Sequence, residues 1–123
     1  MNVKIDTKER FTVIKPEEAH LSVNMTEEFN QLLLDYLQKD IAHIVLQMEA
    51  VESVDEAMAE NIATVQQKFY ENNSSFVICN LQKAVEKLLE EKELLELMNV
   101  TPSESEAWDI LQMEEIEREL LGE

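Results

Sequence analysis

Two short, fully apolar segments do most to constrain the fold of this chain. Residues 44–46 read Ile-Val-Leu and residues 76–79 read Phe-Val-Ile-Cys, without a charged or amide side chain in either. A strand that is apolar at every position has both faces covered, which is typical of parallel sheets between layers of helices. Between the two segments, apolar residues recur at helical spacing: Met58, Ile62, Val65 and Phe69. The order strand, helix, strand therefore predicts a right-handed crossover between parallel strands.

Further elements extend this unit in both directions. Residues 3–5 and 11–14 are predicted as two short strands that pair antiparallel, and residues 99–100 as a last edge strand. Three helices are expected to begin at polar residues that suit a helix cap: Asn24, Asn80 and Thr101. The sequence thus predicts a single α/β domain with a mixed four- to five-stranded sheet and about four helices.

The chain is strongly acidic. It has 123 residues with 27 acidic and 10 basic side chains, and a net charge of −17. Such a chain repels nucleic acid phosphates and anionic lipids, so we expect neither as a partner. One cysteine cannot form an internal disulfide. The first residues form no apolar signal run, and no apolar stretch approaches the roughly 20 residues that span a bilayer. We therefore expect a cytoplasmic protein.

Composition argues against most catalytic and cofactor-binding motifs. Gly122 is the single glycine, so the chain lacks a glycine-rich phosphate loop and the Gly-x-Ser-x-Gly elbow of hydrolases. Cys79, His20 and His43 lie far apart in the sequence, and no two of them have the spacing of metal ligands. No nucleophile and base are placed as a pair. The sequence therefore predicts a protein that is not an enzyme and that holds neither a cofactor nor a metal.

With these elements placed, the chain shows a resemblance to a known family. Residues 43–58 resemble the centre of the STAS domain, the fold of bacterial anti-sigma factor antagonists, in which an apolar strand leads through an Asp-Ser-Ser-Gly stretch into a helix. Residues 76–81 are similar to the family's next strand, residues 93–101 to its closing turn and edge segment, and residues 103–107 to the start of its last helix. The likeness covers residues 2–112 in the family's order.

The family's phosphorylation motif is altered in this chain. By resemblance, the family aspartate falls on Asp55, the first serine on Glu56, the phosphorylated serine on Ala57 and the glycine on Met58. Alanine has no hydroxyl, so the resemblance implies that the usual phosphorylation switch is absent. A register shifted by one residue would place Glu56 at the acceptor position. In a separate alternative, Ser53 is a displaced phosphoacceptor. Without any such role, Asp55 and Glu56 suit the start of a helix as cap and first-turn acid.

The resemblance implies a protein that binds other proteins and catalyses nothing. Its partner would be an anti-sigma factor, or a related serine/threonine kinase, with a kinase-like ATP-binding fold. Binding would free a sigma factor for transcription. The expected binding surface lies where strands lead into helices, and its residues would be Ser22, Asn24, Asp55, Glu56, Ala57 and Asn61. The alternative is a scaffold subunit in an assembly of STAS domains.

The apolar pattern of the last helix changes sides along its length. Ala107, Ile110 and Leu111 share one side. A second apolar row, the tail stripe, lies about 120° or more away on helical angles: Met113, Ile116 and Leu120. We expect the helix either to break near Gln112 or to leave the domain with this stripe. The chain is accordingly divided into a STAS-like domain, residues 1–112, and an acidic helical extension, residues 113–123, which would dock on another copy or on a partner.

Overall fold

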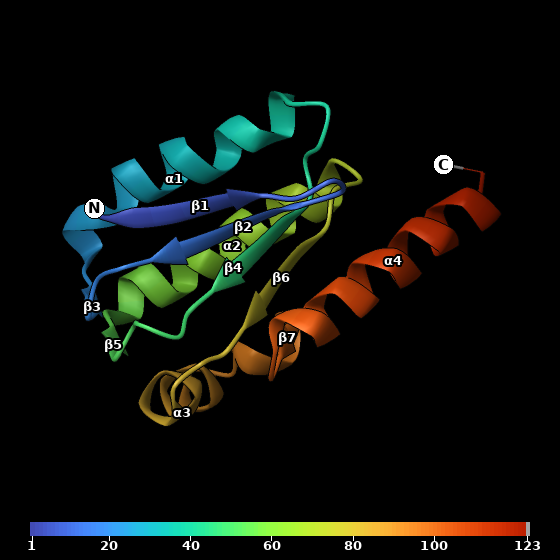
Figure 1. Cartoon of the computed structure of the whole chain (residues 1–123). Coiled ribbons are helices and arrows are strands. Elements are labelled where there is room, and N and C mark those ends of the chain that lie inside the picture. The colour runs from blue at the N-terminus through green and yellow to red at the C-terminus, as the bar shows by residue number, and fades with distance from the viewer. Residues whose placement is uncertain (123) are drawn as a thin grey trace.

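The centre of the molecule is a five-stranded mixed sheet, and the computed structural model describes residues 1–122 (Figure 1). The strands are β1 (Val3–Thr7), β2 (Thr12–Pro16), β4 (Ile44–Gln47), β6 (Phe76–Cys79) and β7 (Val100–Thr101). Their spatial order is β1-β2-β4-β6-β7. β1 and β2 are antiparallel, and the other neighbours are parallel. The predicted mixed sheet, with its antiparallel first pair, is confirmed.

A second sheet of two very short strands lies at the carboxyl end of β4. β3 (His20–Leu21) pairs in parallel with β5 (Ser53–Val54), in a register that aligns His20 with Ser53. A 3-10 turn, η1 (Val23–Met25), follows β3 and leads into the first α-helix. Two-residue strands carry no alternating pattern, so the sequence did not predict this pairing. The small sheet brings the segment before the first helix beside the start of the second.

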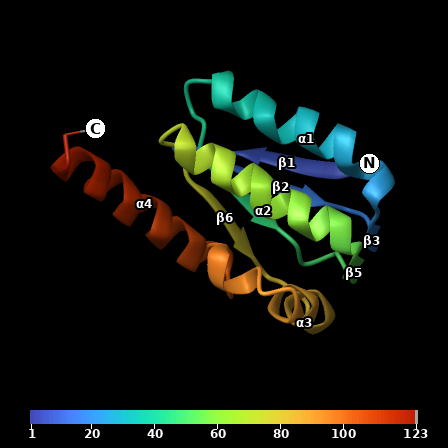
Figure 2. The same ribbon diagram turned by 180° about the vertical axis from the view of Figure 1, so that it is seen from behind.

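Four α-helices cover the sheet within residues 1–122. They are α1 (Thr26–Leu34), α2 (Glu56–Glu71), α3 (Lys83–Glu91) and α4 (Glu104–Leu120), with 3-10 turns η2 (Asp35–Gln38) after α1 and η3 (Leu95–Leu97) after α3. Figures 1 and 2 show α1 and α2 side by side over one face, with α4 away from them on the other side of the sheet. None of the helices in the described part of the chain has the length and apolar character needed to cross a membrane.

Alternating side chains of the strands divide the core into two layers. One set faces α1, α2 and α3: Ile14, Ile44, Leu46, Phe76 and Ile78. The intervening Val45, Val77 and Cys79 face α4, where Ala107 and Leu111 cover them. The buried phenylalanines all belong to the first layer, so it supplies most of the apolar area. The second layer is thin, and burial there raises the pKa of the Cys79 thiol to about 12.

The predicted helix caps are wrong in detail, because pairing of distant segments overrides the local signals. Asn24 lies inside η1 and caps nothing. Asn80 adopts a φ of 59°, a left-handed conformation that asparagine tolerates, and α3 starts further on. At α4 the cap is Ser103, whose Oγ accepts the backbone N–H of Glu106. Thr101 does not cap this helix because β7 holds it against β6.

α4 crosses Gln112 without a break, so the expected break is absent. Its first half packs Ala107 and Leu111 against the sheet. Along its second half the side that faces the protein is polar, with Glu114 and Arg118 hydrogen-bonded to the body, while the tail stripe is exposed. The apolar pattern changes sides because the side of α4 that faces the body is apolar in the first half of the helix and polar in the second half. The division of the chain at this residue stays a prediction, and Glu123 lies outside the described residues.

Candidate functional site

A corner between η1 and the start of α2 gathers most of the predicted binding residues. We call it the Asp55 corner, residues 20–25 and 53–57. Asp55 holds the cap position of α2, but its side chain makes no bond to that helix. The carboxylate instead accepts the backbone N–H of Val23 on Oδ2 at 2.7 Å, and Oδ1 lies 3.0 Å from His20 Nε2. Asp55 therefore ties the segment before α1 to the start of α2.

His20 completes the hydrogen bonding of this corner. Its Nδ1 lies 2.7 Å from Ser53 Oγ, and its Nε2 faces the Asp55 carboxylate. An ionised carboxylate only accepts, so Nε2 carries a hydrogen that it donates to Asp55, and Nδ1 shares a hydrogen bond with the Ser53 hydroxyl. The Val23 N–H, and then His20, lower the pKa of Asp55. The carboxylate thus stays ionised at neutral pH and keeps its bonds.

The sequence did not predict the hydrogen-bonded series Ser53, His20 and Asp55, because His20 is distant from the other two in the chain. The same residue types act as nucleophile, base and orienting acid in hydrolases. Here Ser53 and His20 are exposed, and the contacts of the series join the paired strands β3 and β5 to the start of α2. The series therefore anchors the corner.

The first turn of α2 is open to solvent. Glu56 and Ala57 are its first two residues, and both are exposed. Glu56 Oε2 lies 3.4 Å from Lys92 Nζ, which also pairs with Glu60 at 3.0 Å. Glu60, and to a lesser extent Glu56, raise the pKa of Lys92. Lys92 therefore remains charged and offsets part of the acidity of this turn.

The remaining predicted binding residues differ in position and exposure. Ser22 and Asn24 belong to the η1 side of the corner, Ser22 half-buried and Asn24 exposed. Asn61 lies one turn beyond Ala57 on α2, and its amide exchanges hydrogen bonds of 3.1 and 2.7 Å with the amide of Asn30 on α1. Its polar groups are thus used within the fold, to join two helices. Whether any of these residues contacts a partner stays a prediction.

A second polar site, the α4 cluster, lies at the opposite end of the parallel strands. The Glu114 carboxylate accepts hydrogen bonds from Tyr70 Oη at 2.9 Å, from Asn99 Nδ2 at 3.0 Å and from the Ser75 hydroxyl. Arg118 Nη2 donates to Ser75 Oγ at 3.0 Å. Burial, and then the Glu114 charge, raise the pKa of Tyr70, so its hydroxyl remains a donor. The cluster holds the second half of α4 on the body.

His43 extends the α4 cluster toward the β1–β2 turn. Its Nδ1 accepts the backbone N–H of Ser75 at 2.9 Å, and its Nε2 lies 3.0 Å from Glu115 Oε1. Glu115 also pairs with Arg10 at 3.3 Å. Because Nδ1 is an acceptor, the ring is neutral and carries its hydrogen on Nε2. Burial lowers the pKa of His43, against the opposing charge of Glu115, and Arg118 adds to the lowering.

Neither polar site is arranged as a metal centre. Among residues 1–122, no group of His, Cys, Asp and Glu side chains could hold a metal ion. The carboxylates with a described role accept hydrogen bonds or pair with cations, as Asp55 and Glu114 do. Hydrogen bonds and ion pairs hold the side chains of both sites in place.

Solved structures of other proteins share this fold. A putative anti-sigma factor antagonist from Thermotoga maritima is 19% identical, with a TM-score of 0.81 over 89% of this chain and 94% of that one. RsbS from Moorella thermoacetica, with one serine changed to glutamate, is 22% identical, with a TM-score of 0.74 over 91% and 96%. The anti-sigma factor antagonist SpoIIAA in its unphosphorylated form is 16% identical, with a TM-score of 0.71 over 90% and 96%.

The family of this chain is established by a match that spans most of its sequence. A search of curated protein sequences found none that matches this chain. The family model of the STAS domain, however, matches residues 2–107, which is most of the chain and includes the Asp55 corner. The resemblance seen in the sequence is thereby confirmed, together with the predicted fold. This chain belongs to the STAS domain family.

Proposed function

We propose that this STAS domain is a noncatalytic regulator that acts as an anti-sigma factor antagonist. It binds an anti-sigma factor, or a related serine/threonine kinase, with a kinase-like ATP-binding fold, and so releases a sigma factor for transcription. Family membership supports this, as do two similar structures that carry the name anti-sigma factor antagonist. The binding surface consists of Ser22, Asn24, Asp55, Glu56, Ala57 and Asn61.

The observation that carries this proposal is the exposed first turn of α2, held against a fixed loop. Glu56 and Ala57 are open to solvent, and the Asp55 carboxylate fixes η1 beside them through Val23. A surface whose two segments are already joined loses little conformational entropy when a partner binds. The surface is also acidic, which favours a basic partner and speeds encounter at low salt.

Binding at this surface proceeds without phosphorylation at the family's usual position. In the register given above, Ala57 occupies the acceptor position, and in the register shifted by one, Glu56 does. Neither side chain has a hydroxyl, so neither accepts a phosphoryl group. Control of binding then lies in the abundance of the protein or in its partner.

Affinity capture from the native cell lysate tests the proposal, with Ala57→Arg as the disruptive variant. Ala84→Arg is the matched control, because Ala84 is also the exposed second residue of a helix, α3. We expect the wild type and Ala84→Arg to capture a protein with a kinase-like ATP-binding fold, identified by mass spectrometry. Ala57→Arg should lose it. Capture of the same protein by all three forms would overturn the proposed surface.

A scaffold subunit of a STAS-domain assembly is the second candidate function, because the exposed tail stripe is an apolar contact surface, although the acidic charge of two copies opposes their contact. In that case the purified protein forms a discrete homo-oligomer, measured by light scattering after size exclusion. Removal of residues 113–123 would abolish the oligomer, whereas Ala57→Arg would leave it unchanged. A monomer at all concentrations would eliminate a homomeric scaffold.

A further inference from the structure

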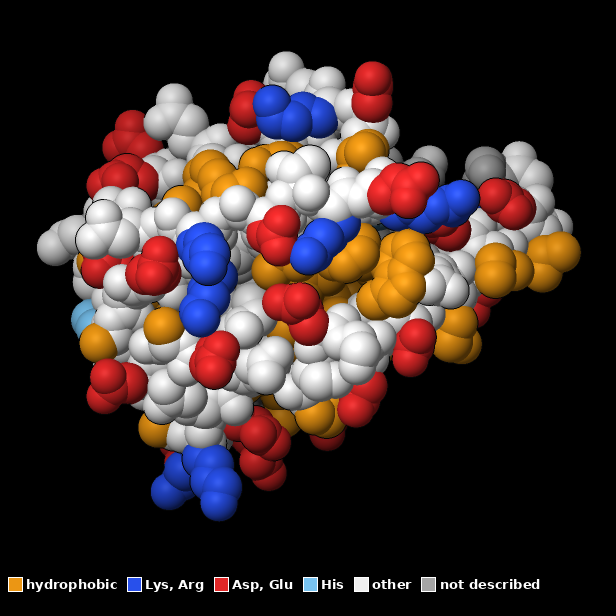
Figure 3. Space-filling view, in the orientation of Figure 1, with side chains coloured by type: hydrophobic (Ala, Val, Ile, Leu, Met, Phe, Trp, Pro, Cys, Tyr) orange, Lys and Arg blue, Asp and Glu red, His pale blue; other side chains and the backbone are white. Residues whose placement is uncertain are grey.

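The tail stripe is an apolar surface that the fold leaves uncovered. Met113, Ile116 and Leu120 are 59%, 55% and 81% exposed, and the neighbouring Leu121 is 76% exposed. Their spacing of three and four residues keeps them on one side of α4. Figure 3 shows hydrophobic side chains at the end of the molecule that carries the second half of α4, with acidic side chains beside them. An apolar row on a helix is a common docking surface for another helix.

The stripe cannot turn inward, because the inner side of this half of α4 is already fixed. Glu114 and Arg118 are hydrogen-bonded to Ser75, and Glu115 lies 3.0 Å from His43. Rotation of the helix would break these bonds and leave the Ser75 and Tyr70 hydroxyls and the Asn99 amide covered by apolar side chains, without their partners, which is unfavourable. The stripe is therefore a standing feature of the folded domain, presented on a rigid helix.

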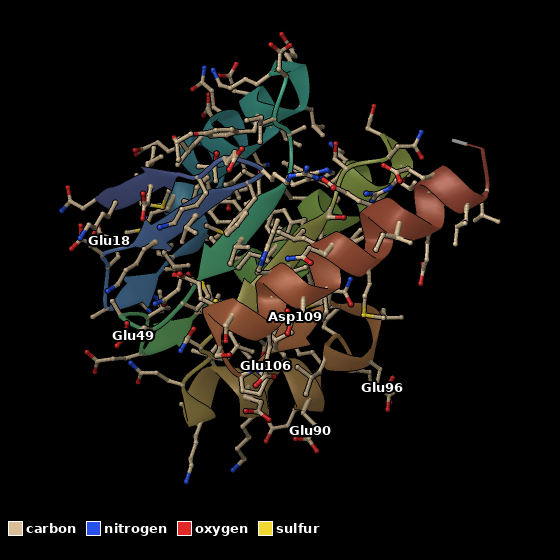
Figure 4. All side chains as sticks on the ribbon, turned by 45° about the vertical axis from the view of Figure 1, so that its right-hand side comes forward. Glu18, Glu49, Glu90, Glu96, Glu106 and Asp109 are labelled. Atoms are coloured by element: carbon tan, nitrogen blue, oxygen red, sulfur yellow. The ribbon has the colours of Figure 1, made fainter. Side chains whose placement is uncertain are left out.

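Acidic side chains surround the stripe. Asp109 lies four residues before Met113 and Glu117 four residues after it, and Glu106 lies a further turn back; all three acids are exposed. Figure 4 shows Glu106 and Asp109 extending from the first half of α4. Two cations of the described residues contact this half of the molecule from other sides: Arg10 pairs with Glu115 at the edge of α4, and Arg118 faces the body and donates to Ser75. The surface thus has an apolar centre and an acidic border.

A groove beside the stripe offers a place for a side chain of a partner. It has a volume of about 290 Å³ and runs between α4 and the β1–β2 turn. Its lining residues are Arg10, Trp108, Gln112, Glu115, Ile116 and Glu119. Because Ile116 belongs to both the groove and the stripe, a helix that packs on the stripe can place an apolar side chain in the groove.

The charges decide between a second copy of this chain and a different protein. Two copies would each bring a net charge of −17 and the same acidic border to the interface. Like charges that face one another across a helix pair are destabilising, whereas lysine and arginine at the flanks pair with this border. We propose that the tail stripe docks a basic amphipathic helix of another protein. This site is independent of the function proposed for the Asp55 corner.

A designed peptide tests the proposed occupant directly. The probe is a fluorescent helical peptide with leucines along one side and lysines on both flanks, and its control carries glutamates in place of the lysines. We expect the lysine peptide to bind the full chain with an affinity in the micromolar range, about 10⁻⁶ M, measured by fluorescence anisotropy at low salt. The glutamate peptide should not bind, and added salt should weaken the lysine peptide.

Three variants locate the binding surface. Ile116→Ser with Leu120→Ser should weaken binding of the lysine peptide by about tenfold or more, because two exposed anchors are lost. Asp109→Lys with Glu117→Lys should also weaken it and reduce its salt dependence. Leu97→Ser is the matched control, because Leu97 is a 77% exposed leucine on η3. It should leave binding unchanged.

Three results would overturn the proposal. The first is that the lysine peptide fails to bind, or that both peptides bind equally. The second is that the serine variants bind as well as the wild type. The third is a dimer of the wild-type chain that disappears in the serine variants, because it would identify a second copy as the occupant. Each result is read from purified protein, so failure of the Asp55 corner to capture its partner remains a separate outcome.

Discussion

The two halves of α4 hold one helix on the same sheet through opposite kinds of contact. In the first half, Ala107 and Leu111 are 0% and 1% exposed and pack on apolar strand residues. In the second half, Glu114 and Arg118 face the body and hydrogen-bond to it, while the apolar residues face solvent. An apolar row therefore marks the buried side of a helix only where the surface beneath it is apolar too. Polar side chains can also form the side of a helix that faces the body, provided that they are hydrogen-bonded there.

The largest effect is expected from truncating the apolar half. Leu111→Ala removes a buried side chain from the thin layer above Val45 and Val77, and should lower the free energy of unfolding by about 2–5 kcal/mol. Urea denaturation followed by circular dichroism measures it. Leu120→Ala on the exposed side is the control and should change stability by less than about 0.5 kcal/mol. Equal losses in both variants would mean that the two halves do not differ as described.

A smaller loss is expected from the polar half. Glu114→Ala leaves the Tyr70 hydroxyl and the Asn99 amide without their acceptor, and should lower the free energy of unfolding by about 1–3 kcal/mol. Glu117→Ala, an exposed neighbour, serves as the control in the same denaturation experiment. A loss no larger than that of Glu117→Ala would show that the α4 cluster contributes nothing, and that the second half of α4 is held by the first alone.

The pH dependence of stability should single out the polar half as well. The pKa of His43 is lowered in the folded protein, so the unfolded chain binds a proton more readily there. The neutral ring contributes fully to the free energy of unfolding above the pKa that His43 has in the unfolded chain, about 6.5. This contribution is lost as the pH falls toward the lower pKa that His43 has in the folded protein. Denaturation of the wild type and His43→Gln should therefore differ most at neutral pH. A difference that grows as the pH falls would contradict this assignment.

The smallest global effect, and the most local one, is expected at the Asp55 corner. Asp55→Ala removes the acceptor of the Val23 N–H on an exposed surface. Hydrogen exchange should show faster exchange of the Val23 amide, by roughly tenfold for about 1.4 kcal/mol of lost local protection. The amides of β4 and β6 should exchange as before. Unchanged exchange at Val23 would mean that η1 is held to α2 by its other contacts.

Much of the fold could be predicted because its signals are local. Residues 44–46 and 76–79 are apolar at every position, and they form the strands β4 and β6 with both faces covered. The helix caps could not be predicted in the same way. Asn80 and Thr101 have the right side chains, but pairing with neighbouring segments fixes their backbones first. Sequence signals thus predict an element reliably where burial along that element determines its structure. They fail where a contact with another element determines it.

The candidate site was predictable only in part, and for the same physical reason. The resemblance placed Asp55 and Ala57 at the start of a helix, where the structure has them. The partners of Asp55 could not be foreseen, because His20 and Val23 come from a two-residue strand and a turn without a sequence pattern. The polar support of α4 is likewise assembled from separate elements, with Tyr70 on α2 hydrogen-bonded to Glu114.

The burial of Cys79 makes its rate of chemical labelling a measure of how often the structure around it opens. It is the single cysteine of the chain, it is 0% exposed beneath α4, and its raised pKa leaves almost no thiolate at neutral pH. An alkylating reagent therefore reacts with Cys79 only when the structure around it opens, as it does when α4 lifts from the sheet. The labelling rate, divided by that of a free thiol under the same conditions, is the equilibrium constant for that opening. A helical ligand that stabilises α4 on the sheet would lower the labelling rate of Cys79. A ligand that displaces α4 would raise it.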